Sequence, residues 1–244
     1  MKMDLVVPQG ESEQRRPERP ALFVGDWRGW LIPPLTLSLL AAVALAVDLP
    51  VAQWAAGRAY PRFVRELMSL AEAFGHGVGV AVVLITVYTL DRPRRKMLPR
   101  SIAVVAAAGC GANLLKLLIA RQRPGSADLL HADVWTTFAG WLPLARNGSA
   151  FQSFPSAHTA TAVGLAMVLS SFYPQGSRLF FVFAGAVAVQ RVLGSAHYPS
   201  DVLGGAAVGW LCAAAAFQLA EKVAAGFGRR SAIGWRSTPP AQRS

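Results

Sequence analysis

The chain has 244 residues, of which 53% are hydrophobic and only 15% are charged, and its mean hydropathy is +0.37. An ordinary globular domain carries roughly 25% charged residues, so this composition argues against a water-soluble enzyme and excludes a disordered chain. The 24 basic residues outnumber the 13 acidic ones and give a net charge of +11. These basic residues lie between apolar runs rather than on one polar face, which indicates a membrane protein and not a nucleic-acid binder.

The chain begins and ends with polar segments and is strongly apolar between them. Residues 1–28 have mixed charge, and we expect them to form a cytoplasmic tail. Six apolar segments follow, at residues 29–47, 73–90, 101–120, 156–173, 179–198 and 202–220. Each would form a helix about 27 Å long, which is enough to cross the hydrocarbon core of a membrane. The sequence therefore predicts an all-α fold, a six-helix transmembrane bundle over residues 29–220 followed by a basic cytoplasmic tail at 221–244.

Residues 62–74, between the first two apolar segments, have the pattern of an amphipathic helix. Phe63, Leu67, Leu70 and Phe74 recur at helical spacing, and charged residues lie on the other faces. We expect a short helix that lies at the membrane surface.

The distribution of positive charge predicts how the bundle is oriented. If both termini are cytoplasmic, 16 Lys and Arg residues lie inside and six lie outside. Because basic residues are enriched in cytoplasmic loops, this imbalance favours an N-in, C-in, multi-pass protein of the cell (inner) membrane.

With this orientation, six ionisable residues lie at the outer ends of the helices: Lys116, Arg123, His158, Arg191, His197 and Asp201. Ionisable side chains in apolar helices are costly and usually functional, so six at one membrane face predict a site. Lys116 and Arg123 are seven residues apart, and they would share one side of the third helix if that helix continues to Arg123.

The residue types at this face suit a tetrahedral oxyanion, most plausibly phosphate. Three fixed cations can hold its oxygens, and Ser156 can cap the fourth helix, whose first free amides, around Ala157, would add an anion-binding terminus. Two histidines can divide the roles of nucleophile and general acid. Asp201, four residues after His197, can fix the tautomer of that imidazole.

A metal site is the competing interpretation. Two histidines and one aspartate could ligate zinc, but three neighbouring cations would repel it. We therefore expect no metal and no cofactor.

The spacings at this face resemble the three signature motifs of the type 2 phosphatidic acid phosphatase superfamily. They read Lys116-x6-Arg123-Pro124, Pro155-Ser156-Ala157-His158 and Arg191-x5-His197-x3-Asp201. The resemblance implies a six-helix membrane phosphatase that works without metal. It also implies that His197 forms a phosphohistidine, that Asp201 orients it, and that His158 protonates the leaving oxygen and then activates water. The phosphoryl oxygens would be held by Lys116, Arg123 and Arg191, with help from Ser156 and the Ala157 amide.

Two positions depart from the family pattern, and two further histidines lie outside it. Ala157 stands where the second motif usually has glycine, and Gln190 where the third usually has serine. An alanine still offers its amide, and a glutamine can still form hydrogen bonds where the family has a serine. We expect His76 to be a packing or interfacial residue and His131 to be solvated.

The predicted function is a membrane phosphatase that acts on a lipid phosphate or diphosphate at the outer face, with membrane lipids as its surroundings. Phosphatidic acid, phosphatidylglycerol phosphate, undecaprenyl diphosphate and the phosphates of lipid A are all candidate substrates. Two alternatives remain: an enzyme like the vanadium-dependent haloperoxidases, and a transporter or binder that captures a lipid headgroup without hydrolysis. The oligomeric state is not predicted.

Overall fold

The computed structural model describes residues 27–58, 60–144 and 148–234, so residues 1–26 of the predicted N-terminal tail and residues 235–244 of the predicted C-terminal tail lie outside the described residues. The helices are α1 (Trp27–Ala44), α2 (Asp48–Ala56), α3 (Arg62–Ala71), α4 (Gly77–Leu90), α5 (Leu98–Lys116), α6 (Ala157–Phe172), α7 (Ser177–Leu193) and α8 (Pro199–Gly234). Short 3-10 helices include η1 (Leu45–Val47), η2 (Glu72–Phe74) and η3 (Arg92–Met97), and the strands are β1 (Ile119–Arg121) and β2 (Phe138–Trp141).

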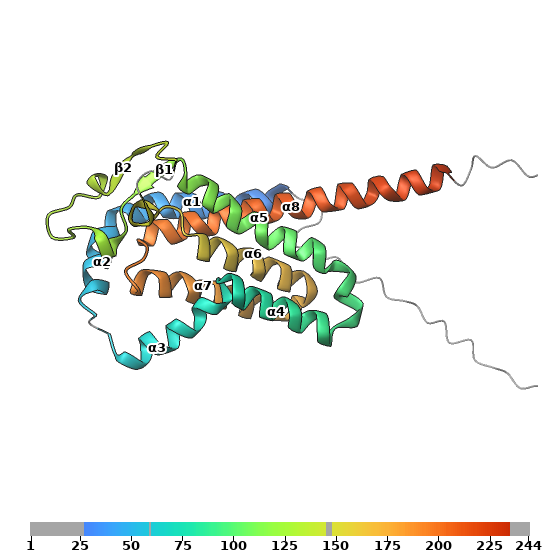
Figure 1. The fold of residues 1–244 in the computed structure, drawn as a ribbon, viewed down its shortest axis with the longest axis horizontal. Helices are drawn as coiled ribbons and strands as arrows, with labels where there is room; N and C mark the ends of the chain where they lie inside the picture. Colours follow the sequence, from blue (N-terminus) through green and yellow to red (C-terminus); the bar gives the residue numbers. More distant parts are fainter. Residues whose placement is uncertain (1–26, 59, 145–147, 235–244) are drawn as a thin grey trace, which may run out of the picture.

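Helix α6 lies at the centre of the bundle, against α5, α7 and α8 (Figure 1). Most of its side chains are buried, and the apolar core combines them with side chains of α4, α5, α7 and α8. Small residues allow this close packing: a Cβ on Gly209 of α8 would come within 2.5 Å of the Ala160 carbonyl oxygen of α6. A central helix with small residues on its neighbours is the packing expected in a membrane bundle.

Within the described part of the chain, four helical stretches are long and apolar enough to cross a membrane: 29–56, 92–116, 174–193 and 199–220. The segments 62–74 and 77–90 pass the same test together but meet at an angle of 64°, and they make a fifth span if they act as one. Helix α6 is apolar but shorter. The predicted membrane-spanning helical fold is thus confirmed, whereas the count of six and the orientation stay predictions.

Helix α3 with η2 occupies the range predicted for the amphipathic helix. Phe63, Leu67 and Leu70 are all more than half exposed, as expected for an apolar face at a membrane surface, whereas the fourth predicted residue of this face, Phe74, packs against Phe183 of α7. In Figure 1 this segment runs obliquely to the bundle axis.

The third predicted helix is too long at its outer end. Helix α5 ends at Lys116, and β1 follows it, paired antiparallel with β2. The purely helical prediction therefore misses a two-stranded sheet, and Arg123 does not share a helix face with Lys116. The physical reason is tertiary, because the extended backbone of Arg121 accepts a hydrogen bond from the amide of Ser153 and carries its side chain into the protein interior.

Three other boundaries also differ from the predictions. Helix α7 ends at Leu193, and the chain turns through Ser195 at a φ of 51°, so His197 lies in a connection and not in a helix. The first span continues past Asp48 to Ala56 because the charge of Asp48 is buried in an ion pair. Helix α8 runs on to Gly234, well into the segment predicted as a tail.

Candidate active site

The predicted site residues come from helix ends that meet at one end of the bundle, beside β1 and β2 (Figure 1). Lys116 is the last residue of α5, His158 lies in the first turn of α6, and Arg191 lies in the last turn of α7. His197 follows in the connection to α8, and Asp201 lies in the first turn of α8. Residues as far apart in the sequence as Lys116 and Asp201 thus come together at one end of the bundle, as the positions of the apolar segments predicted.

The His197 imidazole is buried, and its hydrogen-bond partner fixes which ring nitrogen carries the proton. Its Nδ1 lies 2.7 Å from the carbonyl oxygen of Ser153. A carbonyl can only accept, so Nδ1 carries the proton and Nε2 keeps a free lone pair. Burial lowers the pKa of His197 below its ordinary value of 6.5, and nearby Asp201 offsets part of this effect. A neutral imidazole with a free Nε2 has the properties of a nucleophile.

The Asp201 carboxylate is fully buried behind this histidine. Its Oδ1 accepts a hydrogen bond from Arg121 at 2.5 Å. Its Oδ2 accepts hydrogen bonds from the Ser153 hydroxyl at 2.6 Å and the Tyr198 amide at 2.9 Å, and lies 3.8 Å from His197 Nδ1. The Ser153 carbonyl thus makes the close contact to His197 that the spacing assigned to Asp201, and the Ser153 hydroxyl links Ser153 to the Asp201 carboxylate.

Arg121 connects Asp201 to a second carboxylate. Its guanidinium has no exposed surface and also donates to Asp48 at 2.6 Å and to the hydroxyl of Ser200 at 2.7 Å. The rings of Phe138 and Tyr198 lie on it at 4.5 and 4.3 Å from their centroids. We call the set that backs His197 the rear network: Asp48, Arg121, Ser153, Ser200 and Asp201.

Three cations, Lys116, Arg123 and Arg191, lie close enough for their charges to act on one another, and the charges of Lys116 and Arg191 also act on His197. Lys116 is buried, and its Nζ donates to the carbonyl of Gln152. Among the described residues, the buried Nε atoms of Arg123 and Arg191 have no hydrogen-bond partner. Buried donors are almost always paired, so these two free N–H groups indicate a ligand that accepts hydrogen bonds.

The start of α6 adds a histidine and free amides. Ser156 is the N-cap, and its hydroxyl accepts a hydrogen bond from the Thr159 amide at 3.4 Å, as predicted. The amides of the first turn, beginning with Ala157, point along the helix axis and favour an anion. The His158 imidazole is partly exposed, with Nε2 at 3.7 Å from the carboxylate of Glu72.

Residues 98–224 match the PAP2 superfamily model, and this range contains all of the predicted site residues. The chain belongs to the PAP2 superfamily. It is 31% identical over 209 residues to a lipid A 1-phosphatase of Rhizobium johnstonii, a match that covers 75% of this chain and 81% of that protein. A lipid A 1-phosphatase of Rhizobium etli is 29% identical over 199 residues, with 75% and 80% covered.

Two solved PAP2-like structures resemble this fold. The transmembrane PAP2 phosphatidylglycerolphosphate phosphatase of Bacillus subtilis gives a TM-score of 0.54 at 20% identity, covering 79% of this chain and 98% of that one. LpxE of Aquifex aeolicus gives 0.52 at 21% identity, covering 70% and 95%. With its candidate spans, the chain is an integral membrane protein with a PAP2 phosphatase fold.

Gln190, which stands where the PAP2 motif usually has serine, makes a hydrogen bond that involves a residue outside the motifs. The Gln190 amide donates to Glu72 Oε2 at 3.1 Å, while Arg191 Nη1 donates to Glu72 Oε1 at 2.7 Å. Glu72 comes from η2 and His76 is the N-cap of α4, so both lie outside the matched range. The His76 ring lies tilted against the His158 ring, with the two centroids 5.8 Å apart. His131 is exposed, as predicted.

Sequence reasoning missed Glu72 and the rear-network residues Asp48, Arg121, Ser153 and Ser200. One signal was available for Asp48, which is the only acid within the first span of 29–56. An ionisable residue inside an apolar span implies a partner, although the spacing alone does not name it.

Proposed function

We propose that this chain hydrolyses a lipid phosphate or diphosphate at the outer face of the cell membrane through a phosphohistidine at His197. The observation that carries the proposal is the pairing of two features. The Ser153 carbonyl fixes the proton of His197 on Nδ1, and three mutually interacting cations lie at the same end of the bundle, two of them with unpaired buried N–H groups among the described residues.

In the first step, His197 Nε2 attacks phosphorus as the bond from phosphorus to the ester oxygen breaks. His158 donates its proton to that oxygen, so the alcohol leaves uncharged. In the second step, His158 takes a proton from water, the hydroxide attacks phosphorus, and the P–N bond breaks. Phosphate leaves, and both histidines return to their starting states. The rear network supports both steps because it keeps His197 in one tautomer.

The cations supply the electrostatic stabilisation that phosphoryl transfer needs on its equatorial oxygens. Arg123 and Arg191 can each donate paired hydrogen bonds, and Lys116 adds a point charge. In the described ranges, no group of three or more His, Cys, Asp or Glu side chains is arranged to hold a metal ion. We therefore propose that no metal takes part.

The curated relatives support a lipid phosphate as the substrate class, since both are lipid A 1-phosphatases. The test is phosphate release by the purified protein in detergent, with excess EDTA, from phosphatidic acid, phosphatidylglycerol phosphate, undecaprenyl diphosphate and lipid A. We expect release from at least one of them. His197→Ala should abolish it, whereas His131→Ala, a matched change at an exposed histidine, should not. No release from any of them, or activity that returns only with one specific metal, would contradict the proposal.

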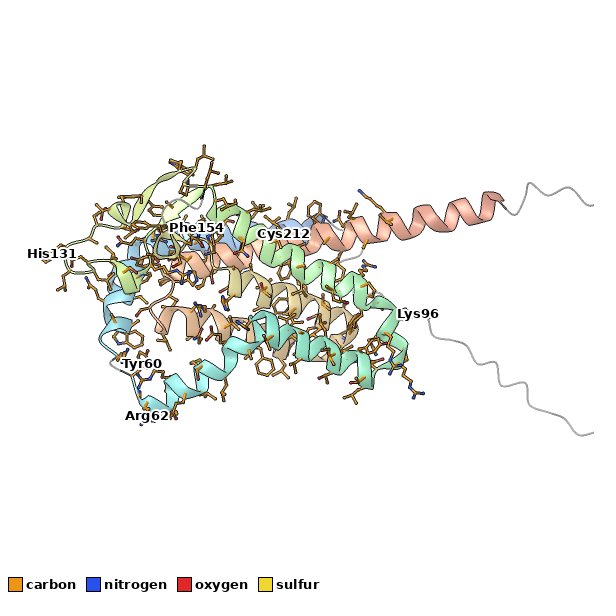
Figure 2. The ribbon with its side chains drawn as sticks, viewed as in Figure 1. Tyr60, Arg62, Lys96, His131, Phe154 and Cys212 are labelled. Carbon is orange, nitrogen blue, oxygen red and sulfur yellow. The ribbon has the colours of Figure 1, made fainter. Side chains whose placement is uncertain are left out.

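The outer location of the site rests on the positive-inside rule, and the two ends of the bundle make it testable. His131 and Lys96 are exposed residues at opposite ends of the molecule (Figure 2). In a background without Cys110 and Cys212, His131→Cys should react with an impermeant thiol reagent in intact cells and Lys96→Cys should not. The reverse pattern would place the site in the cytoplasm.

A further inference from the structure

A carboxylate enters the site from the bent corner between α3 and α4. Glu72 Oε1 accepts a hydrogen bond from Arg191 at 2.7 Å and lies 3.7 Å from Nε2 of His158. Glu72 Oε2 accepts from Gln190 at 3.1 Å. An acid in a site built for an anion repels the substrate, so its presence requires a physical reason.

The backbone fixes the position of this corner. A Cβ on Gly75 would lie 2.5 Å from the carbonyl oxygen of His158, so the chain around Glu72 lies directly against the first turn of α6. The ring of Phe74 packs tilted on Phe183 of α7 at 5.5 Å. Glu72 is therefore held between α6 and α7 by packing as well as by its own hydrogen bonds.

His158 is surrounded by groups that oppose its protonation. Burial of the imidazole is the main factor, because it disfavours the charged form. The charges of Arg191 from α7, His197 from the connection before α8, His76 from the cap of α4 and Lys116 from α5 add to it. Each is a cation or becomes one on protonation. A general acid must hold a proton before the reaction begins, so this environment by itself leaves His158 unsuited to protonate an alkoxide.

Glu72 is the carboxylate that faces this imidazole among the described residues, since Asp201 is turned away toward Arg121. An opposite charge at about 4 Å favours the charged form of a titrating group. Glu72 Oε1 also pairs with Arg191. When a phosphoryl oxygen takes over the guanidinium, the carboxylate is left to act on His158.

We propose that Glu72 is a positioning residue that keeps the proton on His158 until the leaving oxygen accepts it. During the first step the P–O bond breaks, the proton moves from His158 to that oxygen, and Glu72 keeps its charge throughout. Gln190 donates a hydrogen bond to the second carboxylate oxygen of Glu72, and this contact gives a role to the glutamine that replaces the usual serine. The inference rests on the proposed function, because it assumes that His158 is the general acid.

The test is Glu72→Gln, which removes the charge and keeps the shape. Two substrates separate the roles: a lipid phosphate, whose alkoxide needs a proton, and p-nitrophenyl phosphate, whose leaving group does not. We expect kcat on the lipid to fall about tenfold or more at pH 8, and the alkaline limb of its pH profile to move about one unit lower. Turnover of p-nitrophenyl phosphate should stay within about threefold of wild type, which also shows that the variant is folded.

Glu66→Gln is the matched control, because Glu66 lies on α3, is exposed and pairs with Arg62 on the same helix. It should behave as wild type on both substrates. Equal losses on both substrates at every pH would overturn the inference in favour of a structural role. A lower KM with unchanged kcat would overturn it in favour of simple competition for Arg191. If wild type releases phosphate from neither substrate, the proposed function itself fails; if wild type is active and only the Glu72→Gln pattern is absent, the inference alone fails.

Discussion

Two arginines only two residues apart, Arg121 and Arg123, show how the same residue type can serve structure or binding. The guanidinium of Arg121 is fully buried and donates to two carboxylates and two hydroxyl groups. Arg123 has a buried Nε without a partner in the described residues. The difference lies in hydrogen-bond pairing as well as in burial. Removing Arg121 would leave two buried carboxylates without their cation, whereas the unpaired donor of the less buried Arg123 is available to a ligand.

The same contrast extends to the carboxylates. Asp48 and Asp201 are completely buried and both pair with the guanidinium of Arg121, whereas Glu72 is partly exposed and pairs with Arg191. The rear network can remain fixed throughout a catalytic cycle. The groups on the substrate side, which we call the front (Glu72, Arg123 and Arg191), would exchange hydrogen-bond partners when a phosphoryl group binds. This is possible because Arg123 and Arg191 keep unpaired N–H groups among the described residues.

The comparison predicts its largest effect for Arg121→Met. This change leaves Asp48 and Asp201 buried without their cation, so we expect a loss of about 3–5 kcal/mol in unfolding free energy and a marked fall in Tm. Arg123→Met should leave Tm unchanged while abolishing phosphate release. Thermal unfolding of both variants in the same detergent is the measurement. Equal Tm values for the two variants would contradict the assignment of a structural role to Arg121 and a binding role to Arg123.

Arg191→Lys tests whether the front needs geometry or only charge. A lysine keeps the positive charge but cannot supply two parallel hydrogen bonds to a phosphoryl group. We expect kcat to fall about 100-fold, the usual effect of losing one transition-state donor. Arg178→Lys, at the exposed start of the same helix, is the control and should retain full activity. A fully active Arg191→Lys variant would reduce Arg191 to a general electrostatic contributor.

A smaller effect is expected in the titration of His197. Because burial lowers its pKa below 6.5, the folded protein keeps this imidazole neutral where a free histidine begins to protonate, and it becomes protonated only at lower pH. The ¹⁵N signals of the labelled protein, assigned with His197→Ala, should show a midpoint below 6.5. The chain has four histidines, which makes the assignment tractable. A midpoint at or above 6.5 would show that Asp201 outweighs burial.

The apolar periodicity and the motif spacings were enough to predict a helical membrane protein and the end of the bundle where the motif residues meet. Those features depend only on each segment's own sequence, because the length of an apolar helix sets the distance between its two ends whichever helices it packs against. The rear network could not be predicted in this way. Arg121 contacts Asp48 and Asp201 across separations of 73 and 80 residues, and nothing in the spacing encodes either pair.

The errors in helix boundaries have the same origin. Residues 117–120 are as apolar as the helix before them, yet α5 stops at Lys116 because Arg121 must reach two carboxylates from an extended strand. Glu72 belongs to the segment 62–74, whose amphipathic pattern predicts a surface helix and gives no sign of a site residue. Glu72 lies near His158 because the chain bends by 64° between this segment and α4, and the sequence does not predict that bend.

The central claim is that His197 carries the phosphoryl group, and rapid quenching tests it most directly. The protein, in excess EDTA, is mixed with ³²P-labelled p-nitrophenyl phosphate and quenched in alkaline detergent, in which phosphohistidine survives. We predict label on the peptide that contains His197 in wild type, more label in His158→Ala because the second step lacks its base, and none in His197→Ala. Release of phosphate by wild type with no label in either wild type or His158→Ala would contradict the account and indicate direct attack by water.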